Sequence, residues 1–241
     1  SEKRRRGGEA LRLWRPMPAQ IPFLRSLASE RLLRGGNRSG KSCCAFAETA
    51  SAATGIPLRD PDGKEIPYKW PRNHKLIIWC IGIDAGHIGN VIHRYLFEEG
   101  AYKLIPDEKT KLLRAFRPWE DYDWEYQEKC VPAPPYIPER MIESISWDDR
   151  GNRVFNTARL ANGNIIQAYS SGGYPKMGVA IDLLHIDEDI LHTSHLPEWQ
   201  ARLADKKGRM VWSVKPHASN DALVMMSDRA LEQQDWEDPH I

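Results

Sequence analysis

Cysteine is scarce in this chain: among 241 residues there are four, of which two are adjacent and none belongs to a Cys-x-x-Cys pair. The sequence therefore indicates neither a disulfide framework nor a thiolate zinc site, and reduced thiols in a cytoplasmic compartment are the simplest interpretation. Long apolar runs are absent too, so no segment is expected to span a bilayer. Arg and Glu interrupt the first residues, which argues against a signal peptide.

A net charge of one sign is also missing. Lys plus Arg total 34 and Asp plus Glu total 33, so the overall charge says nothing about a nucleic-acid partner. Basic residues do gather at the start, in Lys3-Arg4-Arg5-Arg6. We therefore expect residues 1–15 to form a basic N-terminal tail. Residues 16–241 are expected to form one domain, since 41% apolar and 28% charged residues are typical of a globular chain.

Stretches with the pattern of strands alternate with stretches that favour helices, which predicts an α/β fold with a mainly parallel central sheet flanked by helices. The apolar runs 75–83 and 180–186 are typical of strands buried on both faces of such a sheet. The turn Asn162-Gly163 joins two more strand patterns and predicts an added β-hairpin. The other predicted elements are strands at 31–34, 144–147 and 209–214 and helices at 41–54, 86–99, 197–204 and 221–234.

Residues 106–140 are the least regular part of the sequence. They are rich in proline and aromatic residues and show no sustained helical or strand period. Proline removes a backbone donor and breaks both kinds of element. We expect an irregular insertion here, with short helices at best.

The residues between the first predicted strand and the first long helix fit G-x-x-x-x-G-K-[ST], the phosphate-binding P-loop pattern of RecA-like NTPases. Glycines let such a loop curl until its N–H groups point at phosphate oxygens, and the following helix adds its positive end. Lys41 is expected to reach the β- and γ-phosphates of ATP, and the Ser42 hydroxyl to bind Mg²⁺. The predicted binding residues are Gly35, Gly36, Asn37, Arg38, Ser39, Gly40, Lys41 and Ser42.

Hydrolysis also needs a carboxylate that holds the metal and a group that activates water. The apolar run 180–186 is followed directly by Asp187 and Glu188. Both acids are therefore expected at the carboxyl edge of the sheet, where ligands bind in open α/β folds. Asp187 is the predicted magnesium ligand, and Glu188 is the predicted base that orients the attacking water and takes its proton.

Two other interpretations of these acids remain open at this point. The acidic run could simply end a strand in solvent. Alternatively, His185, His192 and His195 flank the acids and could form a metal cluster with them. Imidazole ligands suit zinc or iron rather than Mg²⁺, and such a cluster would leave the P-loop without a purpose.

Four motifs, taken in order, resemble a known family. They are residues 16–20, the P-loop, His185-Ile186-Asp187-Glu188, and residues 212–216. This order is similar to the ATPase domain of a large terminase subunit, the DNA-packaging motor of tailed double-stranded DNA phages. The resemblance extends over nearly the whole chain, although only at separated motifs.

The resemblance implies roles for three further residues. Gln20 matches the glutamine that recognises adenine, for which a side-chain amide offers both a donor and an acceptor. A glutamine in a surface loop is the alternative. Arg38 matches the arginine that these motors place against the γ-phosphate. Ser213 matches the coupling motif that links hydrolysis to movement.

One position departs from the family pattern. Several members carry Arg-Gly about ten residues before the acidic pair and use this arginine as a finger in the neighbouring subunit, whereas this chain has Lys176-Met177-Gly178. Lysine lacks the bidentate fork of arginine. The candidates for the trans finger are therefore Lys176, Arg140, Arg153 and Arg159.

The resemblance also implies partners. These are double-stranded DNA, the portal protein, the small terminase subunit, and further copies of the chain in a ring, with a monomer conceivable in isolation. The place of action would be the host cell cytoplasm, with no membrane involved. Family members carry a C-terminal nuclease domain, for which no room remains after Ser213, so no nuclease activity is expected of these residues. The cofactors would be ATP and Mg²⁺.

Two alternatives of different kinds compete with a packaging ATPase. A helicase-like, DNA-dependent ATPase would be expected to have a second motor domain rich in arginine motifs, which this sequence lacks. A non-catalytic scaffold that only senses nucleotide would not need a carboxylate at Glu188.

Overall fold

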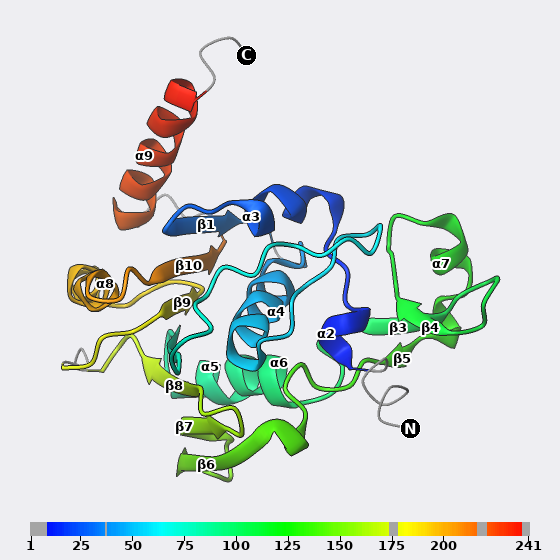
Figure 1. Cartoon of the computed structure of the whole chain (residues 1–241), viewed down its shortest axis with the longest axis horizontal. Helices are drawn as coiled ribbons and strands as arrows, with labels where there is room; N and C mark the ends of the chain where they lie inside the picture. Colours follow the sequence, from blue (N-terminus) through cyan, green and yellow to red (C-terminus); the bar gives the residue numbers. More distant parts are fainter. Residues whose placement is uncertain (1–8, 37, 174–177, 216–220, 238–241) are drawn as a thin grey trace.

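The main sheet is a mostly parallel layer that runs through the middle of the molecule (Figure 1). The computed structural model describes residues 9–36, 38–173, 178–215 and 221–237, with side chains omitted for 232–237. Within these residues the strand order is β1-β10-β9-β2-β8-β7-β6. Neighbours from β1 to β8 are parallel, and the β8–β7 and β7–β6 pairs are antiparallel. The strands are β1 (Glu30–Arg34), β2 (Ile77–Gly82), β6 (Ile142–Asp149), β7 (Val154–Leu160), β8 (Ile165–Ser170), β9 (Leu183–Asp187) and β10 (Arg209–Val214).

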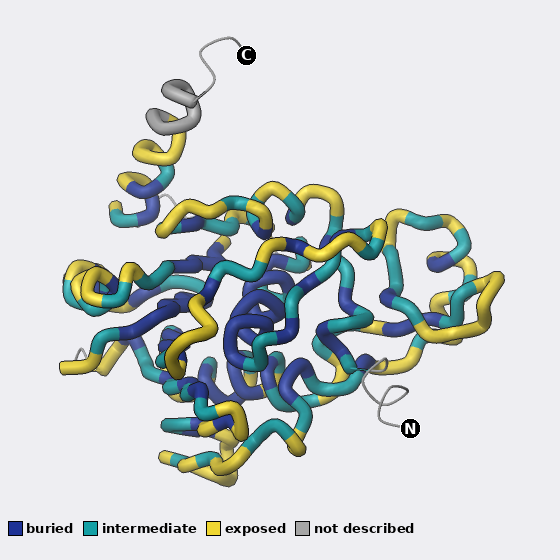
Figure 2. Tube along the Cα trace, viewed as in Figure 1, coloured by how far each residue is buried: buried dark blue, intermediate teal, exposed yellow. Residues whose placement is uncertain are grey.

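Two apolar cores lie on opposite faces of this sheet because side chains alternate along each strand. Ile78 and Cys80 of β2 join one core, whereas Trp79 and Ile81 join the other. Helix α4 (Lys41–Thr54) fills the first core and is buried along most of its length (Figure 2). Helices α8 (Leu196–Ala204) and α9 (Asp221–Glu237) cover the second face. This layered α/β arrangement confirms the predicted fold class.

The added hairpin is formed by β7 and β8, which the Asn162-Gly163 turn connects as expected. Gly163 has a φ of +87°, a conformation that glycine adopts without strain. Strand β6 then extends the sheet beyond β7, with register shifts that mark bulges along it.

A continuous helical segment follows β2 and leads back across the sheet. It consists of α5 (Ala85–His87), a π-helical turn η2 (Ile88–His93) and α6 (Arg94–Phe97). Asp84 caps its start by accepting a hydrogen bond from the backbone N–H of His87. At Gly89 an added Cβ would lie 2.1 Å from the carbonyl oxygen of Asn152. Glycine is therefore required where the turn between β6 and β7 meets this helix.

The expectation of an irregular insertion over residues 106–140 is wrong, because this part contributes to a small second sheet. Strands β3 (Lys103–Pro106), β4 (Leu113–Ala115) and β5 (Val131–Pro132) pair antiparallel in the order β4-β3-β5, next to helix α7 (Asp121–Glu125). These strands are too short to show a period in the sequence. In Figure 1 the small sheet lies at the end of the molecule opposite α9.

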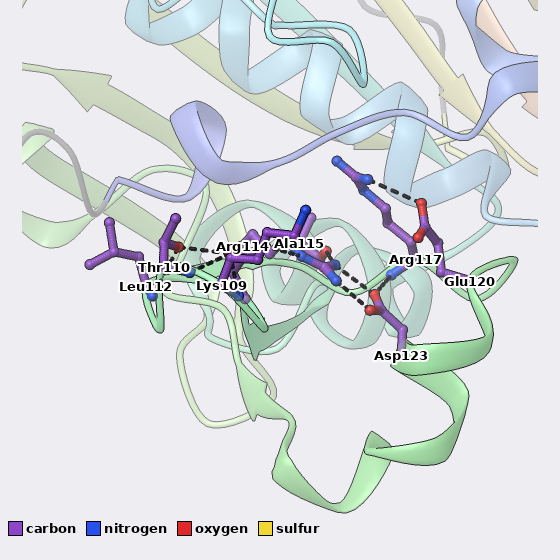
Figure 3. Close-up of polar contacts among 9 residues, drawn as sticks. Lys109, Thr110, Leu112, Arg114, Ala115, Arg117, Glu120 and Asp123 are labelled. Atoms are coloured by element: carbon purple, nitrogen blue, oxygen red, sulfur yellow. Dashed lines mark hydrogen bonds and ion pairs between the residues drawn. The ribbon is translucent and has the colours of Figure 1, made fainter.

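An ion pair holds the small sheet to its helix. Both terminal nitrogens of Arg114 donate to the carboxylate of Asp123, at 2.7 and 2.5 Å, and the two side chains face each other in Figure 3. The backbone N–H of Arg117 donates to the same carboxylate at 2.6 Å. Burial alone would raise the pKa of Asp123, but the bonds from Arg114 and Arg117 outweigh it and lower the pKa.

The predicted tail boundary at residue 15 needs correction. Helix α2 (Ala10–Leu13) and the following Trp14 are buried in the first core, so the ordered domain begins before residue 16. Arginines alternate with the apolar residues here, so the sequence shows no helical period that would predict this short helix. Residues 1–8 lie outside the described part of the chain.

The remaining elements are short connections. They are η1 (Pro18–Gln20), α3 (Ile21–Arg25), η3 (Gln127–Lys129), η4 (Glu139–Met141) and η5 (Thr193–His195). None of the helices in the described ranges is long and apolar enough to cross a lipid bilayer.

Candidate nucleotide site

The P-loop follows β1 and leads directly into α4. Gly40 adopts a φ of +77° as the residue before the helix, and Arg38 adopts +63°. A Cβ added at Gly40 would lie 2.6 Å from the methyl group of Met17, so glycine serves both the curl and the close packing. The backbone thus turns sharply where the pattern requires it. Asn37 lies outside the described residues.

Lys41 and Glu188 meet although they are 147 positions apart in sequence (Lys41 at the start of α4, Glu188 just after β9). The Nζ atom of Lys41 donates to Oε1 of Glu188 at 2.5 Å, with 8% of the lysine side chain and 32% of the glutamate side chain exposed. The P-loop and the acidic pair therefore share one site at the carboxyl edge of the main sheet, as expected for ligands of α/β folds.

Asp187 is buried beside this pair and is held from two sides. The Ser213 hydroxyl donates to its Oδ1 at 2.5 Å, and Nε2 of His87 lies 2.9 Å from its Oδ2. Ser213 is the register partner of Asp187 in the parallel pairing of β10 with β9. Burial alone would raise the pKa of Asp187, but the hydrogen bonds from His87 and Ser213 outweigh it and lower the pKa. The carboxylate is therefore ionised.

A chain of hydrogen bonds supports Asp187 from behind. Thr49 Oγ1 lies 2.9 Å from Nδ1 of His185, and Nε2 of His185 lies 3.2 Å from the Ser213 hydroxyl oxygen. Burial lowers the pKa of His185 to about 4, so the ring is neutral and has one donor and one acceptor. Because Ser213 donates to Asp187, it accepts from His185, which in turn accepts from Thr49. Every donor in this chain points toward Asp187.

The backbone of Glu188 is fixed by the neighbouring strand β10. Its N–H donates to the Ser213 carbonyl at 2.7 Å, and its carbonyl accepts from the indole of Trp212 at 2.8 Å. Glu188 has a φ of +65°, a left-handed conformation that is uncommon outside glycine. Such strain is found at functional sites when the surroundings determine the backbone.

A pocket of about 430 Å³ opens beside these groups. Ser42, Asp187 and Glu188 border it on one side, and the helical segment after β2 borders it on the other. This second side carries His87, Asn90 and Arg94, which the sequence analysis did not single out. A signal was available, because polar residues that follow the predicted strand 75–83 must lie at the same sheet edge as the acidic pair.

A larger cavity of about 1070 Å³ lies between this helical segment and the turn of the β6–β7 hairpin. It is bordered by Asn90, which also borders the smaller pocket, and by Asp148, Asp149 and Arg153. It does not include the P-loop or the acidic pair, so its size does not make it the nucleotide site.

Gln20 is buried against the P-loop rather than exposed in a surface loop. Its Nε2 donates to the Gly40 carbonyl at 3.2 Å, and its Oε1 accepts from the Met17 N–H at 2.9 Å. Both ends of the amide therefore bond to backbone, one of them to the loop itself.

The arginine candidates lie in different surroundings. Arg38 is exposed on the P-loop. Arg140 pairs with Glu9, and Arg153 pairs with Glu98 at 2.5 Å. Arg159 is exposed on β7. Lys176, the remaining candidate, lies outside the described residues.

The alternative of a histidine metal cluster is wrong. His185 is buried between Thr49 and Ser213, whereas His192 and His195 contact each other with ring centroids 5.2 Å apart. Among the described residues, no group of three or more His, Cys, Asp or Glu side chains is arranged to hold a metal. Burial of Asp187 also contradicts the alternative of a strand end in solvent.

The residues at the pocket fit Mg²⁺. A hydroxyl from Ser42 and an ionised carboxylate from Asp187 border the same space, and oxygen ligands of this kind are those that Mg²⁺ prefers. Ser42 and Asp187 would hold such an ion, which would offset negative charge on a ligand in the pocket.

Strand β1, the glycine-rich loop and helix α4 follow one another in the chain, and the acidic pair lies at the end of β9, which β10 separates from β1 in the sheet. This arrangement defines a P-loop NTPase fold. Comparison with solved structures narrows this class. The crystal structure of the HK97 bacteriophage large terminase aligns with a TM-score of 0.53 at 14% identity, covering 95% of this chain and 38% of that one. The large terminase ATPase domain of Thermus phage P74-26 aligns with a TM-score of 0.47 at 16% identity, covering 87% of this chain and 68% of that one.

The chain therefore has the fold of a phage large terminase, and the predicted resemblance is confirmed at the level of fold. It spans well under two thirds of the HK97 protein. No protein-family model and no curated protein matches the chain.

Proposed function

We propose that this chain is the ATPase motor domain of a phage DNA-packaging terminase, which hydrolyses MgATP to move double-stranded DNA into a procapsid. One observation carries the proposal: Lys41 of the P-loop lies 2.5 Å from Glu188, beside a pocket that Ser42 and Asp187 also border. The terminase fold supports the choice of this motor over other P-loop ATPases.

Each residue has a distinct role in the proposed reaction. The P-loop N–H groups and Lys41 bind the phosphates, while Ser42 and Asp187 hold Mg²⁺. Glu188 orients the attacking water and accepts its proton. Arg38, exposed on the loop, adds positive charge near the γ-phosphate. Gln20 contacts the loop through the Gly40 carbonyl.

Substrate binding must separate Lys41 from Glu188. In the present arrangement the ammonium group of Lys41 occupies Oε1 of Glu188, the carboxylate that the attacking water must reach. A triphosphate offers Lys41 several anionic oxygens in place of one carboxylate. Glu188 is then released for the water molecule only when the substrate is in position, which limits unproductive activation of water.

The wider role follows from the same proposal. DNA would be gripped through its phosphates without reading of sequence. A ring of copies would act with the portal protein and the small terminase subunit. Ser213, which bonds to Asp187 and to the backbone of Glu188, is the proposed link between hydrolysis and movement of β10.

Glu188→Gln tests the catalytic assignment. The amide retains the shape of the carboxylate but cannot accept the proton, so turnover should fall by about 100- to 10,000-fold. Affinity for a non-hydrolysable ATP analogue should stay within a few-fold. Both quantities are measured with and without double-stranded DNA, by phosphate release and by fluorescence titration.

Glu143→Gln is the matched control, because Glu143 is exposed on β6, away from the pocket. It should turn over ATP like the unaltered chain. Full turnover by the Glu188→Gln variant would remove Glu188 from the mechanism, and absence of any ATP binding by the unaltered chain would overturn the proposed function as a whole.

A further inference from the structure

The helical segment Ala85–Phe97 presents one face to the nucleotide pocket. Five of its residues border the pocket, spaced at three and four positions as expected for one side of a helix. They are His87, Asn90, Val91, Arg94 and Tyr95. A π-helical turn, of the kind often found at functional sites, lies in the middle of this face.

Arg94 is the permanently charged cation among the described residues that border this pocket. Arg153, which borders the neighbouring larger cavity, is by contrast engaged with Glu98. Arg94 is exposed and forms no ion pair with a described residue. A guanidinium left without an anion at the rim of a pocket is available to a ligand that carries one.

The remaining charges of the pocket explain what this ligand would need. Asp187 and Glu188 make one wall anionic, and Lys41 is the nearby cation that offsets Glu188. A triphosphate seated beside these acids requires further positive charge at the pocket. Arginine meets this need well because its planar fork binds two phosphate oxygens at once.

The position of the helix is fixed relative to the acids. His87, seven residues before Arg94, bonds to Asp187 at 2.9 Å, and Gly89 rests against the backbone of Asn152. Arg94 therefore projects from a wall whose distance from the metal-binding acid is set by a direct contact. Asn90, between them, adds an amide to the same face.

We propose that Arg94 binds the terminal phosphate of ATP within the same subunit, in addition to Lys41, and so distinguishes ATP from ADP. This inference rests on the proposed function, since it assumes that the pocket receives a nucleoside triphosphate. It adds a cation from the helix after β2 to the positive groups of the P-loop.

Equilibrium binding of a non-hydrolysable ATP analogue and of ADP, each with Mg²⁺, tests the proposal. Arg94→Ala should weaken binding of the triphosphate by about 10- to 100-fold and leave ADP within about twofold, because one charge-assisted contact is lost to one phosphate. Arg94→Lys should recover part of the loss, since a point charge replaces the fork. The preference for triphosphate over diphosphate is a readout that a purely structural role would not move.

Arg72→Ala is the control. Arg72 is exposed and stacks on Tyr68 before the amino end of β2, away from the carboxyl edge. It should bind both nucleotides normally, and thermal unfolding of each variant checks that it is folded. Equal losses for ATP and ADP, or no loss for either, in the Arg94→Ala variant would overturn the role of Arg94. Failure of the unaltered chain to bind either nucleotide would instead overturn the proposed function.

Discussion

Two buried aspartates, one at the end of a main-sheet strand and one in the helix beside the small sheet, are held in different ways. In the main sheet, Asp187 accepts hydrogen bonds from the Ser213 hydroxyl and the His87 imidazole and borders an open pocket. In helix α7, Asp123 accepts hydrogen bonds from both terminal nitrogens of Arg114, on the small sheet, and from a backbone N–H (Figure 3). A guanidinium neutralises Asp123, whereas the partners of Asp187 leave its negative charge available to a metal ion.

The comparison shows that the same side chain is closed off by an arginine in one place and borders an open pocket in the other. A carboxylate that is paired with arginine has its charge compensated and its hydrogen bonds made within the fold. It therefore stabilises a small unit that has little apolar core of its own. A carboxylate that is held by a hydroxyl and an imidazole is equally well oriented, but no guanidinium compensates its negative charge at the pocket. Four predictions test this difference.

Asp187→Asn should have the largest effect. Loss of the negative charge weakens the hold on Mg²⁺, and turnover of ATP should fall by about 1000-fold, in line with the several kcal/mol that a metal ion contributes. Asp123→Asn, the matched change in the helix beside the small sheet, should leave turnover within about twofold. Steady-state phosphate release measures both, and a similar loss in the two variants would contradict the distinction.

Arg114→Ala should lower the stability of the small sheet by about 3 kcal/mol, because it leaves the Asp123 carboxylate buried without its cation. The effect should be local. Amide hydrogen exchange should accelerate in residues 103–132 and remain unchanged in β9 and β10. Lys129→Ala, which removes an exposed cation stacked on Tyr126, is the control and should alter exchange little.

Ser213→Ala should affect the main sheet more moderately. It removes one of the two hydrogen bonds to Asp187 and leaves His185 without its acceptor. We expect kcat to fall by about 10-fold and the free energy of unfolding to fall by about 1–2 kcal/mol, with analogue binding nearly unchanged. Ser146→Ala, on the exposed β6, should change neither quantity, and an unaltered kcat for Ser213→Ala would argue against a positioning role.

The smallest expected effect is the response of the small sheet to acid. The pKa of Asp123 is lower in the folded chain than its unfolded value of about 4. Its contribution to stability is therefore complete above that unfolded value and is lost as the pH falls through it toward the folded value. Hydrogen exchange in residues 103–132 should accelerate over this range, and Asp123→Asn should remove the dependence.

The main sheet could be predicted because its signals are strong and local. The runs 75–83 and 180–186 were too apolar to lie anywhere but inside a sheet, and the P-loop pattern placed a turn and a helix at their observed positions. The acidic pair followed from the same logic. Strand β9 begins at Leu183 rather than at 180 and includes Asp187, a small difference at its ends.

The rest depended on contacts that no pattern encodes. The strands of the small sheet are two to four residues long and two of them contain proline, so they form only because the surrounding chain brings them together. The hydrogen bond between His87, in the helical segment after β2, and Asp187, at the end of β9, joins residues that are one hundred positions apart in sequence. The left-handed conformation of Glu188 results from its bonds to β10, and glutamate itself gives no hint of it.

Gly89 connects the helix that borders the pocket to the turn between β6 and β7. Because no side chain separates the helix from the turn at Asn152, the two backbones bear directly on each other. A partner that displaced the β6–β7 turn would therefore also displace the helix, which forms a wall of the pocket.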